Sequence, residues 1–209
     1  MKEDRRVRKT RSAIKSSFIE LLNEKELEKI TIQDIADRAD INRGTFYLHY
    51  EDKYLLLSDM EDEFISQMTF LNHLHNIMGK DPEDTAKNFI NIILKNMLQH
   101  ISDNITFYQT ILQLNRKSKL EEKIYSLIGE NMQKYISTNH EIEGIPEKYF
   151  HSYVAGATIS TVKFWVNDPH RLSVEDLTNH IFKIIYNGPL RIMVQHQYKA
   201  LILTQRNKD

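Results

Sequence analysis

The sequence predicts an all-α fold built from a row of amphipathic helices. The chain of 209 residues contains only six glycines and four prolines, well under the usual frequency of either, which disfavours a turn-rich sandwich or barrel. Apolar residues recur along most of it at the three- and four-residue spacings of a single helix face. No stretch approaches the roughly 18 apolar residues of a membrane-spanning helix. Helices packed around a common core are therefore expected.

The amino-terminal part predicts one longer helix and two short ones. The first is expected over residues 8–24, where one apolar stripe repeats at i, i+4, i+7 and i+8 through Ile14, Phe18, Leu21 and Leu22. Thr31 and Asp34 form the T-x-x-D signal that begins a second helix of about two turns. After a tight connection, Asn42 can cap a third helix over residues 43–50. By spacing, this is a helix-turn-helix.

The rest of the chain predicts longer helices. Asp52 can cap a fourth helix that runs from about residue 53 to 74. A boundary follows at residues 78–82, where Pro82 suits the first position of a new helix. Further helices are expected over 82–101, 105–114, 118–136, 146–165 and 173–186, with a polar connection at 139–146. Residues 189–209 are either a final helix or a loose tail.

Charge and cysteine content indicate the kind of partner and the cellular compartment. The net charge is only -1, but residues 1–15 carry seven Lys or Arg against Glu3 and Asp4, a local +5. Such a basic arm suits phosphate contact, with a solvated, frayed terminus as the alternative. The absence of cysteine fits a reducing compartment, and no apolar segment of a secretory signal follows the charged start. These features predict a cytoplasmic protein that does not cross a membrane.

No motif of an enzyme, metal site or cofactor site is present. The only close histidine pair, His73-x-His75, places its rings about 200° apart on a helix, which is unsuitable for zinc. Nucleophile-elbow, phosphate-loop and dinucleotide-binding glycine patterns are absent from the sequence. The sequence therefore predicts a non-enzyme without a catalytic residue, metal or cofactor.

The third expected helix has two distinct faces. At about 100° per residue, Phe46 and Tyr50 fall together, whereas Gly44, Thr45 and Leu48 lie on the opposite side. Tyr47 and His49 flank the second face. A helix that buries two aromatic rings and presents small and hydroxyl groups outward suits the major groove of DNA. Lys53, at the start of the next helix, would add a cation.

Residues 31–57, TIQDIADRADINRGTFYLHYEDKYLLL, closely resemble the signature of TetR-family transcriptional regulators. The resemblance covers the first helix through the start of the fourth, about a quarter of the chain. It implies a three-helix DNA-binding head at residues 1–52, a helical dimerisation and effector domain at 53–188, and a carboxy-terminal segment at 189–209. The implied DNA contacts are Thr31, Arg43, Thr45, Tyr47, His49 and Lys53, with Gly44 allowing close approach. Asn42 departs from the acidic or hydroxyl residue common there, but it still caps.

The carboxy-terminal half carries a weaker resemblance. Residues 149–186, with Tyr153-x-x-Gly156 and Trp165, look like a region common in regulators of low-GC Gram-positive bacteria. Some proteins with this region resemble activators that recognise a partner protein instead of a small molecule. The expected function is a ligand-responsive repressor that binds a palindromic operator in double-stranded DNA. The alternative is a helical interaction module whose carboxy-terminal half binds a partner protein, possibly as an activator.

A homodimer is expected because two helix-turn-helix units related by a twofold axis can read two half-sites. We place its interface on the last two strong helices, at Gly156, Val162, Trp165, Leu177, Ile181 and Ile184. The alternative assigns these residues to the core of one subunit. An effector pocket is expected between the fourth and eighth helices, with walls formed by Met97, Phe107, Ile111 and Tyr125. Packed core is again the alternative reading.

Overall fold

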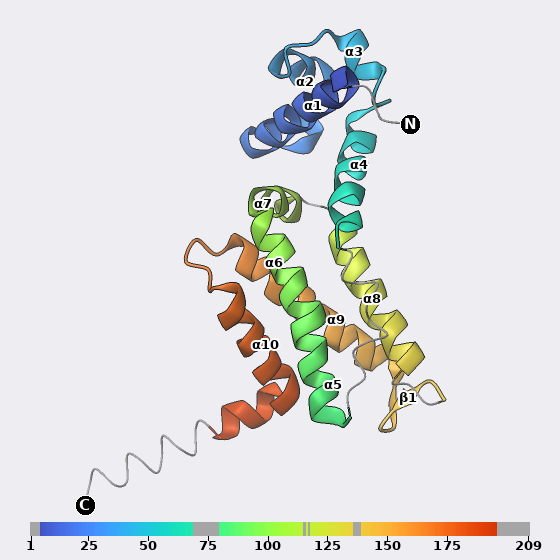
Figure 1. The fold of residues 1–209 in the computed structure, drawn as a ribbon, viewed down its shortest axis with the longest axis vertical. Coiled ribbons are helices and arrows are strands. Elements are labelled where there is room, and N and C mark those ends of the chain that lie inside the picture. The colour runs from blue at the N-terminus through green and yellow to red at the C-terminus, as the bar shows by residue number, and fades with distance from the viewer. Residues whose placement is uncertain (1–4, 69–79, 115, 117, 136–138, 196–209) are drawn as a thin grey trace, which may run out of the picture. The chain divides into compact units, whose positions relative to one another are not determined.

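A computed structural model describes residues 5–68, 80–114, 116, 118–135 and 139–195 of the chain (Figure 1). Its described part is almost entirely helical, as predicted. The amino-terminal elements are α1 (Arg5–Glu24), the single turn η1 (Leu27–Lys29), α2 (Ile32–Arg38), α3 (Arg43–Tyr47) and α4 (Lys53–Ser66). The later ones are α5 (Pro82–Asn88), η3 (Phe89–Leu94), α6 (Lys95–Asp103), α7 (Ile105–Gln113), α8 (Lys119–Tyr135), β1 (Glu141–Ile142), β2 (Ile145–Pro146), α9 (Glu147–Asn167) and α10 (Val174–Asn187). Residues 189–195 are also helical.

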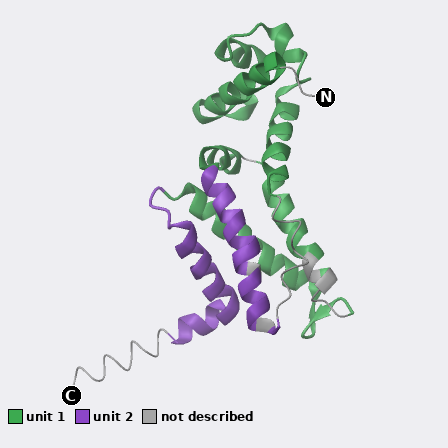
Figure 2. Ribbon diagram, in the orientation of Figure 1, with its two compact units in different colours: residues 1–68, 104–168 green, residues 69–103, 169–209 purple. Residues whose placement is uncertain are grey.

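The chain divides into two compact units (Figure 2). The first comprises residues 1–68 and 104–168, so it holds α1–α4 together with α7–α9. Within it α2 contacts both α1 and α3, α4 contacts α8, and α9 contacts α7 and α8. Its amino-terminal core is formed by fully buried side chains that include Ile14, Phe18, Ile35, Phe46 and Leu56. Burying several such side chains, each worth about 1.5–3 kcal/mol, is what holds the short α2 and α3 in place.

The second unit comprises residues 69–103 and 169–209. Here α10 packs against α6 and η3. Its core includes Ile93, Leu98, Ile101, Leu177 and Ile181, all buried. The predicted divisions at residues 52 and 188 do not follow these two compact units, and as divisions of function they stay predictions.

Four local features differ from the expectations. The third helix, expected over residues 43–50, spans only Arg43–Tyr47. The fourth helix ends at Ser66, where Gln67 closes it; residues 69–74 of its predicted length lie outside the described residues. A two-residue antiparallel ladder, Glu141–Ile142 against Ile145–Pro146, occupies the predicted polar connection. A π-helical turn at Phe89–Leu94 interrupts the helix expected over 82–101. Periodicity misses the last two because a strand pair this short and one widened turn change the apolar spacing very little.

Candidate nucleic-acid interface

A reciprocal hydrogen-bond pair begins α2. The Thr31 hydroxyl accepts the Asp34 backbone N–H at 3.1 Å, and the Asp34 carboxylate accepts the Thr31 backbone N–H at 2.7 Å. The Lys25 ammonium lies 2.9 Å from the same carboxylate. The Thr31 backbone hydrogen bond, followed by the Lys25 contact, lowers the pKa of Asp34 from 3.8 to about 2. The predicted capping box is thus confirmed, and it holds an exposed Thr31 at the helix start.

The turn into α3 is closed by Asp40 and Asn42. Asp40 adopts the left-handed conformation with φ 53°, which an Asp tolerates better than most residues. The Asn42 side-chain oxygen then accepts the Thr45 backbone N–H at 2.7 Å and the Thr45 hydroxyl at 3.0 Å. A Cβ on Gly44 would lie 3.3 Å from that same oxygen. Gly44 therefore leaves room for the cap as well as for an approaching ligand.

The inner face of α3 is anchored as predicted. Phe46 is fully buried, and its ring centroid lies 5.9 Å from that of the buried Tyr50. The Tyr50 hydroxyl donates to the Asp59 carboxylate at 3.2 Å and accepts from Arg11 Nε at 3.2 Å. Burial raises the pKa of Tyr50, so this phenol stays neutral near neutral pH. Aromatic packing and the Asp59 hydrogen bond together lock the end of α3 onto α1 and α4.

The outer face of α3 lies open to solvent. Arg43 and Gly44 are exposed, and Tyr47 is 45% exposed. Arg43 Nη2 donates to the Tyr47 hydroxyl oxygen at 2.9 Å, so the two side chains form one unit on the surface. Thr45 and His49 are half-buried at the edge of this face. The structure therefore brings together five of the seven predicted DNA contacts on α3 and its end, and Thr31 begins the neighbouring helix.

The Lys53 side chain makes contacts within the chain that the sequence did not predict. Its ammonium donates to three backbone carbonyls, those of Leu27 at 2.8 Å, Glu28 at 3.0 Å and Ile30 at 2.7 Å. An ammonium has three protons, and all three are used here. In this conformation the ammonium is therefore occupied within the chain, and its contact with DNA stays a prediction. Lys53 instead ties the start of α4 to the turn η1, which precedes α2.

The basic amino-terminal helix also splits into two groups. Arg11 and Lys15 turn inward, where each lies within 3.0 Å of the Asp59 carboxylate. Burial lowers the pKa of Lys15, but the hydrogen bonds that its ammonium donates to Asp59 and Glu63 outweigh this and raise the pKa, which keeps the lysine charged. Arg5, Arg8 and Lys9 are exposed, and Lys2 lies outside the described residues. Only the first turns of α1 thus remain available to phosphate.

The predicted effector residues differ in their burial. Met97, Phe107 and Ile111 are buried, whereas Tyr125 is exposed and its ring stacks near His151 with centroids 4.1 Å apart. The gap beside Phe107 and Ile111 has no room for a water molecule, because Phe64 stacks on Phe107 with ring centroids 3.9 Å apart. Met97, Phe107 and Ile111 are thus packed core, which was the alternative interpretation, whereas Tyr125 is not.

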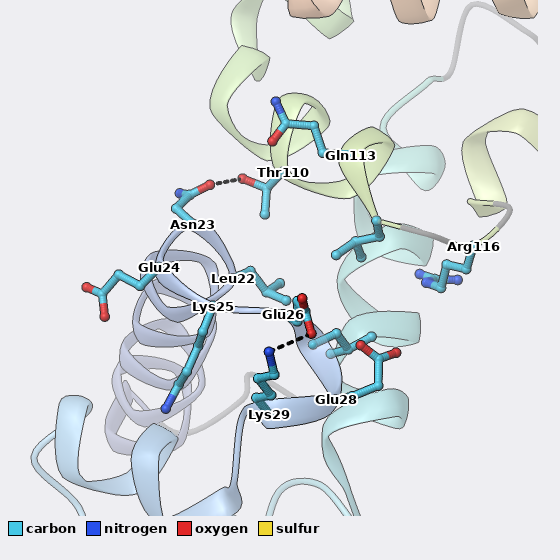
Figure 3. Close-up of a pocket in the computed structure, with 12 residues that line it drawn as sticks. Leu22, Asn23, Glu24, Lys25, Glu26, Glu28, Lys29, Thr110, Gln113 and Arg116 are labelled. Carbon is cyan, nitrogen blue, oxygen red and sulfur yellow. Dashed lines mark hydrogen bonds and ion pairs between the residues drawn. The ribbon is translucent and has the colours of Figure 1, made fainter.

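An open cleft of about 780 Å³ lies elsewhere, between the end of α1, η1 and the end of α7 (Figure 3). Polar groups of its lining are paired within the chain: Lys29 lies 3.0 Å from Glu26, and the Thr110 hydroxyl donates to the Asn23 side-chain oxygen at 2.8 Å. The sequence could not indicate this cleft, because it joins segments more than 80 residues apart.

The predicted dimer residues divide by exposure. Val162, Trp165, Leu177 and Ile181 are buried within the single chain, so they belong to its core and are not available to a partner. Gly156 and Ile184 are exposed. Periodicity finds apolar faces but does not distinguish a face buried within a subunit from one buried between subunits.

Within the described residues, no group of three or more His, Asp or Glu is placed to hold a metal ion. Among the same residues, no helix combines the length and apolarity needed to cross a membrane.

The geometry of α2, α3 and their turn is that of a helix-turn-helix protein. Comparison with known protein families identifies the family. Residues 19–60 match the family of bacterial regulatory proteins, tetR family, and residues 88–187 match a transcriptional regulator C-terminal region. The chain belongs to the TetR family of DNA-binding transcriptional regulators, a family of regulators and not of enzymes.

Three relatives illustrate the match. The regulator YvdT of Bacillus subtilis is 24% identical over 181 residues, which are 82% of this chain and 91% of YvdT. YxbF of the same organism is 18% identical over 175 residues, but this chain spans only 43% of its length. The crystal structure of a TetR transcriptional regulator from Streptococcus agalactiae 2603V is 27% identical, with 87% of this chain and 96% of that chain covered and a TM-score of 0.59.

Proposed function

We propose that this regulator acts as a homodimer that binds a palindromic operator and represses transcription until an effector releases it. The observation that carries the proposal is the division of α3 into two faces. Phe46 and Tyr50 are buried in the core, whereas Arg43, Gly44 and Tyr47 are exposed to solvent. A polar, partly aromatic helix face held by two caps matches the requirements of a major-groove reader.

Roles within this face follow from chemistry. Arg43 carries a fork of N–H donors suited to guanine or phosphate, and the hydrogen bond to Tyr47 orients it before DNA arrives. Thr45 and His49 lie where hydroxyl and imidazole groups could meet a base edge or phosphate. Thr31, at the exposed start of α2, is placed for a backbone phosphate. The exposed Arg8 and Lys9 would add sequence-independent attraction.

A stripe of exposed residues on α9 supports a dimer. Tyr149, Tyr153 and Phe164 are exposed at spacings of four and eleven residues, which places them on one side of the helix. Gly156 lies on the same side, and a Cβ built there would meet no atom within 4 Å. Three aromatic side chains around a glycine provide the apolar, closely approachable surface of a self-complementary interface. This stripe replaces the buried Val162 and Trp165 in the proposal.

An effector would act through α4, whose middle is bonded both to α1 and to the start of α8. Near the head, the Asp59 carboxylate pairs with Arg11 and Lys15 and accepts a hydrogen bond from the Tyr50 hydroxyl. Two residues further on, the buried Glu61 pairs with Arg116 and accepts the Lys119 backbone N–H at 2.9 Å. A change at the start of α8 would therefore be transmitted to the head, with a coupling of about 1–3 kcal/mol expected for allosteric regulators.

A specific observation favours a second candidate. Because the gap beside Phe107 and Ile111 is closed, a partner protein that binds the exposed carboxy-terminal surface is an alternative source of regulation. Pull-down of that partner by the full chain would support this candidate, whereas a small molecule that weakens operator binding would support the first.

Binding to DNA from upstream of the protein's own gene tests the proposal. Fluorescence anisotropy should show specific binding that Tyr47→Ala weakens by at least tenfold, because an exposed contact is removed without disturbing the core. Tyr186→Ala is a matched control, since this tyrosine is 52% exposed on α10 and outside the head. Equal weakening by both variants, or equal affinity for random duplex, would contradict the proposed function.

A further inference from the structure

Leu48 is an exposed apolar side chain at the residue that directly follows α3. It is 84% exposed, more than any other large apolar side chain in the part of the chain that the structure describes. Its backbone is still helical, with φ -70° and ψ -18°, and its N–H donates to the Gly44 carbonyl at 3.3 Å. Leu48 therefore lies one turn beyond Gly44, on the face opposite the buried Phe46.

The surroundings of Leu48 are polar. Tyr47 precedes it and His49 follows it in the chain, and the exposed Arg43 donates a hydrogen bond to the Tyr47 hydroxyl. Neither aromatic anchor can cover the leucine, because Phe46 and Tyr50 are directed into the core. Leaving such a side chain in water forgoes the favourable free energy of burying its apolar surface. A single leucine within a polar face is much smaller than the apolar patches of a few hundred Å² that mark protein interfaces.

We propose that Leu48 reads the methyl group of a thymine in the major groove. The thymine C5-methyl is the apolar group that base edges display there, and apolar side chains recognise it by contact. Gly44 favours this contact because the absence of a side chain one turn earlier lets the duplex approach the helix beside the leucine. The proposal rests on the proposed operator binding and assigns part of its sequence preference to Leu48.

The test compares thymine with deoxyuridine, which lacks only the methyl group. Operators are first selected from a pool of random duplexes with the full chain, and each thymine is then replaced singly by deoxyuridine. At one position of each half-site, the wild-type protein should bind the uracil duplex about fourfold more weakly, the equivalent of one buried methyl group. Replacement in both half-sites should weaken binding by about 15-fold.

Leu48→Ala should bind the thymine and uracil duplexes equally, whereas Leu48→Met, which keeps an apolar side chain of similar size, should retain the preference. Leu190→Ala is the matched control, because this leucine is 71% exposed and lies outside the head; its thymine preference should equal that of the wild type. Unchanged circular dichroism of Leu48→Ala verifies that the head remains folded.

Two results would overturn the inference alone: a wild-type protein indifferent to uracil at every position, or a Leu48→Ala variant with the wild-type preference. Failure to enrich any sequence from the pool would instead contradict the proposed function, and the inference with it.

Discussion

Replacing Lys53 by methionine separates a structural role from a DNA-contacting role. The substitution keeps most of the apolar stem but removes the ammonium that donates to the carbonyls of Leu27, Glu28 and Ile30. A hydrogen bond with a charged partner contributes about 1.5–3 kcal/mol. Three such bonds are not additive here, because the lysine is half-buried and water can reach the carbonyls once it is gone. We expect a loss of roughly 2–4 kcal/mol.

Thermal unfolding followed by circular dichroism measures this loss. For a chain of this size, the expected destabilisation corresponds to a fall in Tm of roughly 4–16 °C. Lys29→Met is the matched control: the Lys29 side chain is 68% exposed and pairs only with Glu26 in the described structure, so its Tm should hardly change.

The salt dependence of DNA binding gives the second readout. Each phosphate contact contributes about 0.9 to the slope of log Kobs against log salt concentration. Because the Lys53 ammonium is already bound to backbone carbonyls, Lys53→Met should leave this slope unchanged below its Tm. A slope reduced by about 0.9 for each subunit, with an unchanged Tm, would refute this assignment and restore Lys53 as a phosphate contact.

Three other predictions concern the head and the dimer. Phe46→Ala should destabilise the chain by about 3–5 kcal/mol, measured by denaturant unfolding, because it empties a fully buried site; a loss below about 1 kcal/mol would place the ring outside the core. The lowered pKa of Asp34 means that its carboxylate stabilises the fold above pH 3.8 and loses this effect as the pH falls through about 2, so Asp34→Asn should unfold with a weaker pH dependence in that window. An unaltered acid transition would argue against the capping box. Tyr153→Glu should convert the dimer to a monomer in sedimentation, because it places a charge in the exposed α9 stripe. Tyr186→Glu should remain dimeric. If both variants remain dimeric, the interface lies elsewhere on the chain.

Local sequence patterns predicted the architecture of the head. The caps at Thr31, Asn42 and Asp52 were all found, since each depends on residues within three positions of one another. The burial of Phe46 and Tyr50 also followed from helical geometry alone. These features are decided within one or two turns of helix, so a single sequence contains the information for them.

Contacts between distant segments could not be predicted in the same way. The acceptors of Lys53 lie 23 to 26 residues earlier in the chain, where no side-chain pattern marks a free carbonyl. Glu61 has the sequence character of a surface glutamate, yet it is buried, where it pairs with Arg116 and accepts the Lys119 backbone N–H. The apolar residues Val162 and Trp165 were correctly assigned to a buried face, but periodicity could not decide which surface buries it.

The selectivity of DNA binding tests the central proposal most directly. The measurement is the ratio of the affinity for a selected palindromic operator to that for a shuffled duplex of equal length and composition, at one physiological salt concentration. The exposed face of α3, presented twice by a dimer, predicts a ratio of at least about 10³ and half-sites about 34–36 Å apart or a multiple of that distance. A ratio near one would mean that the protein is attracted only by charge, and would contradict the assignment of α3 as a reader of sequence.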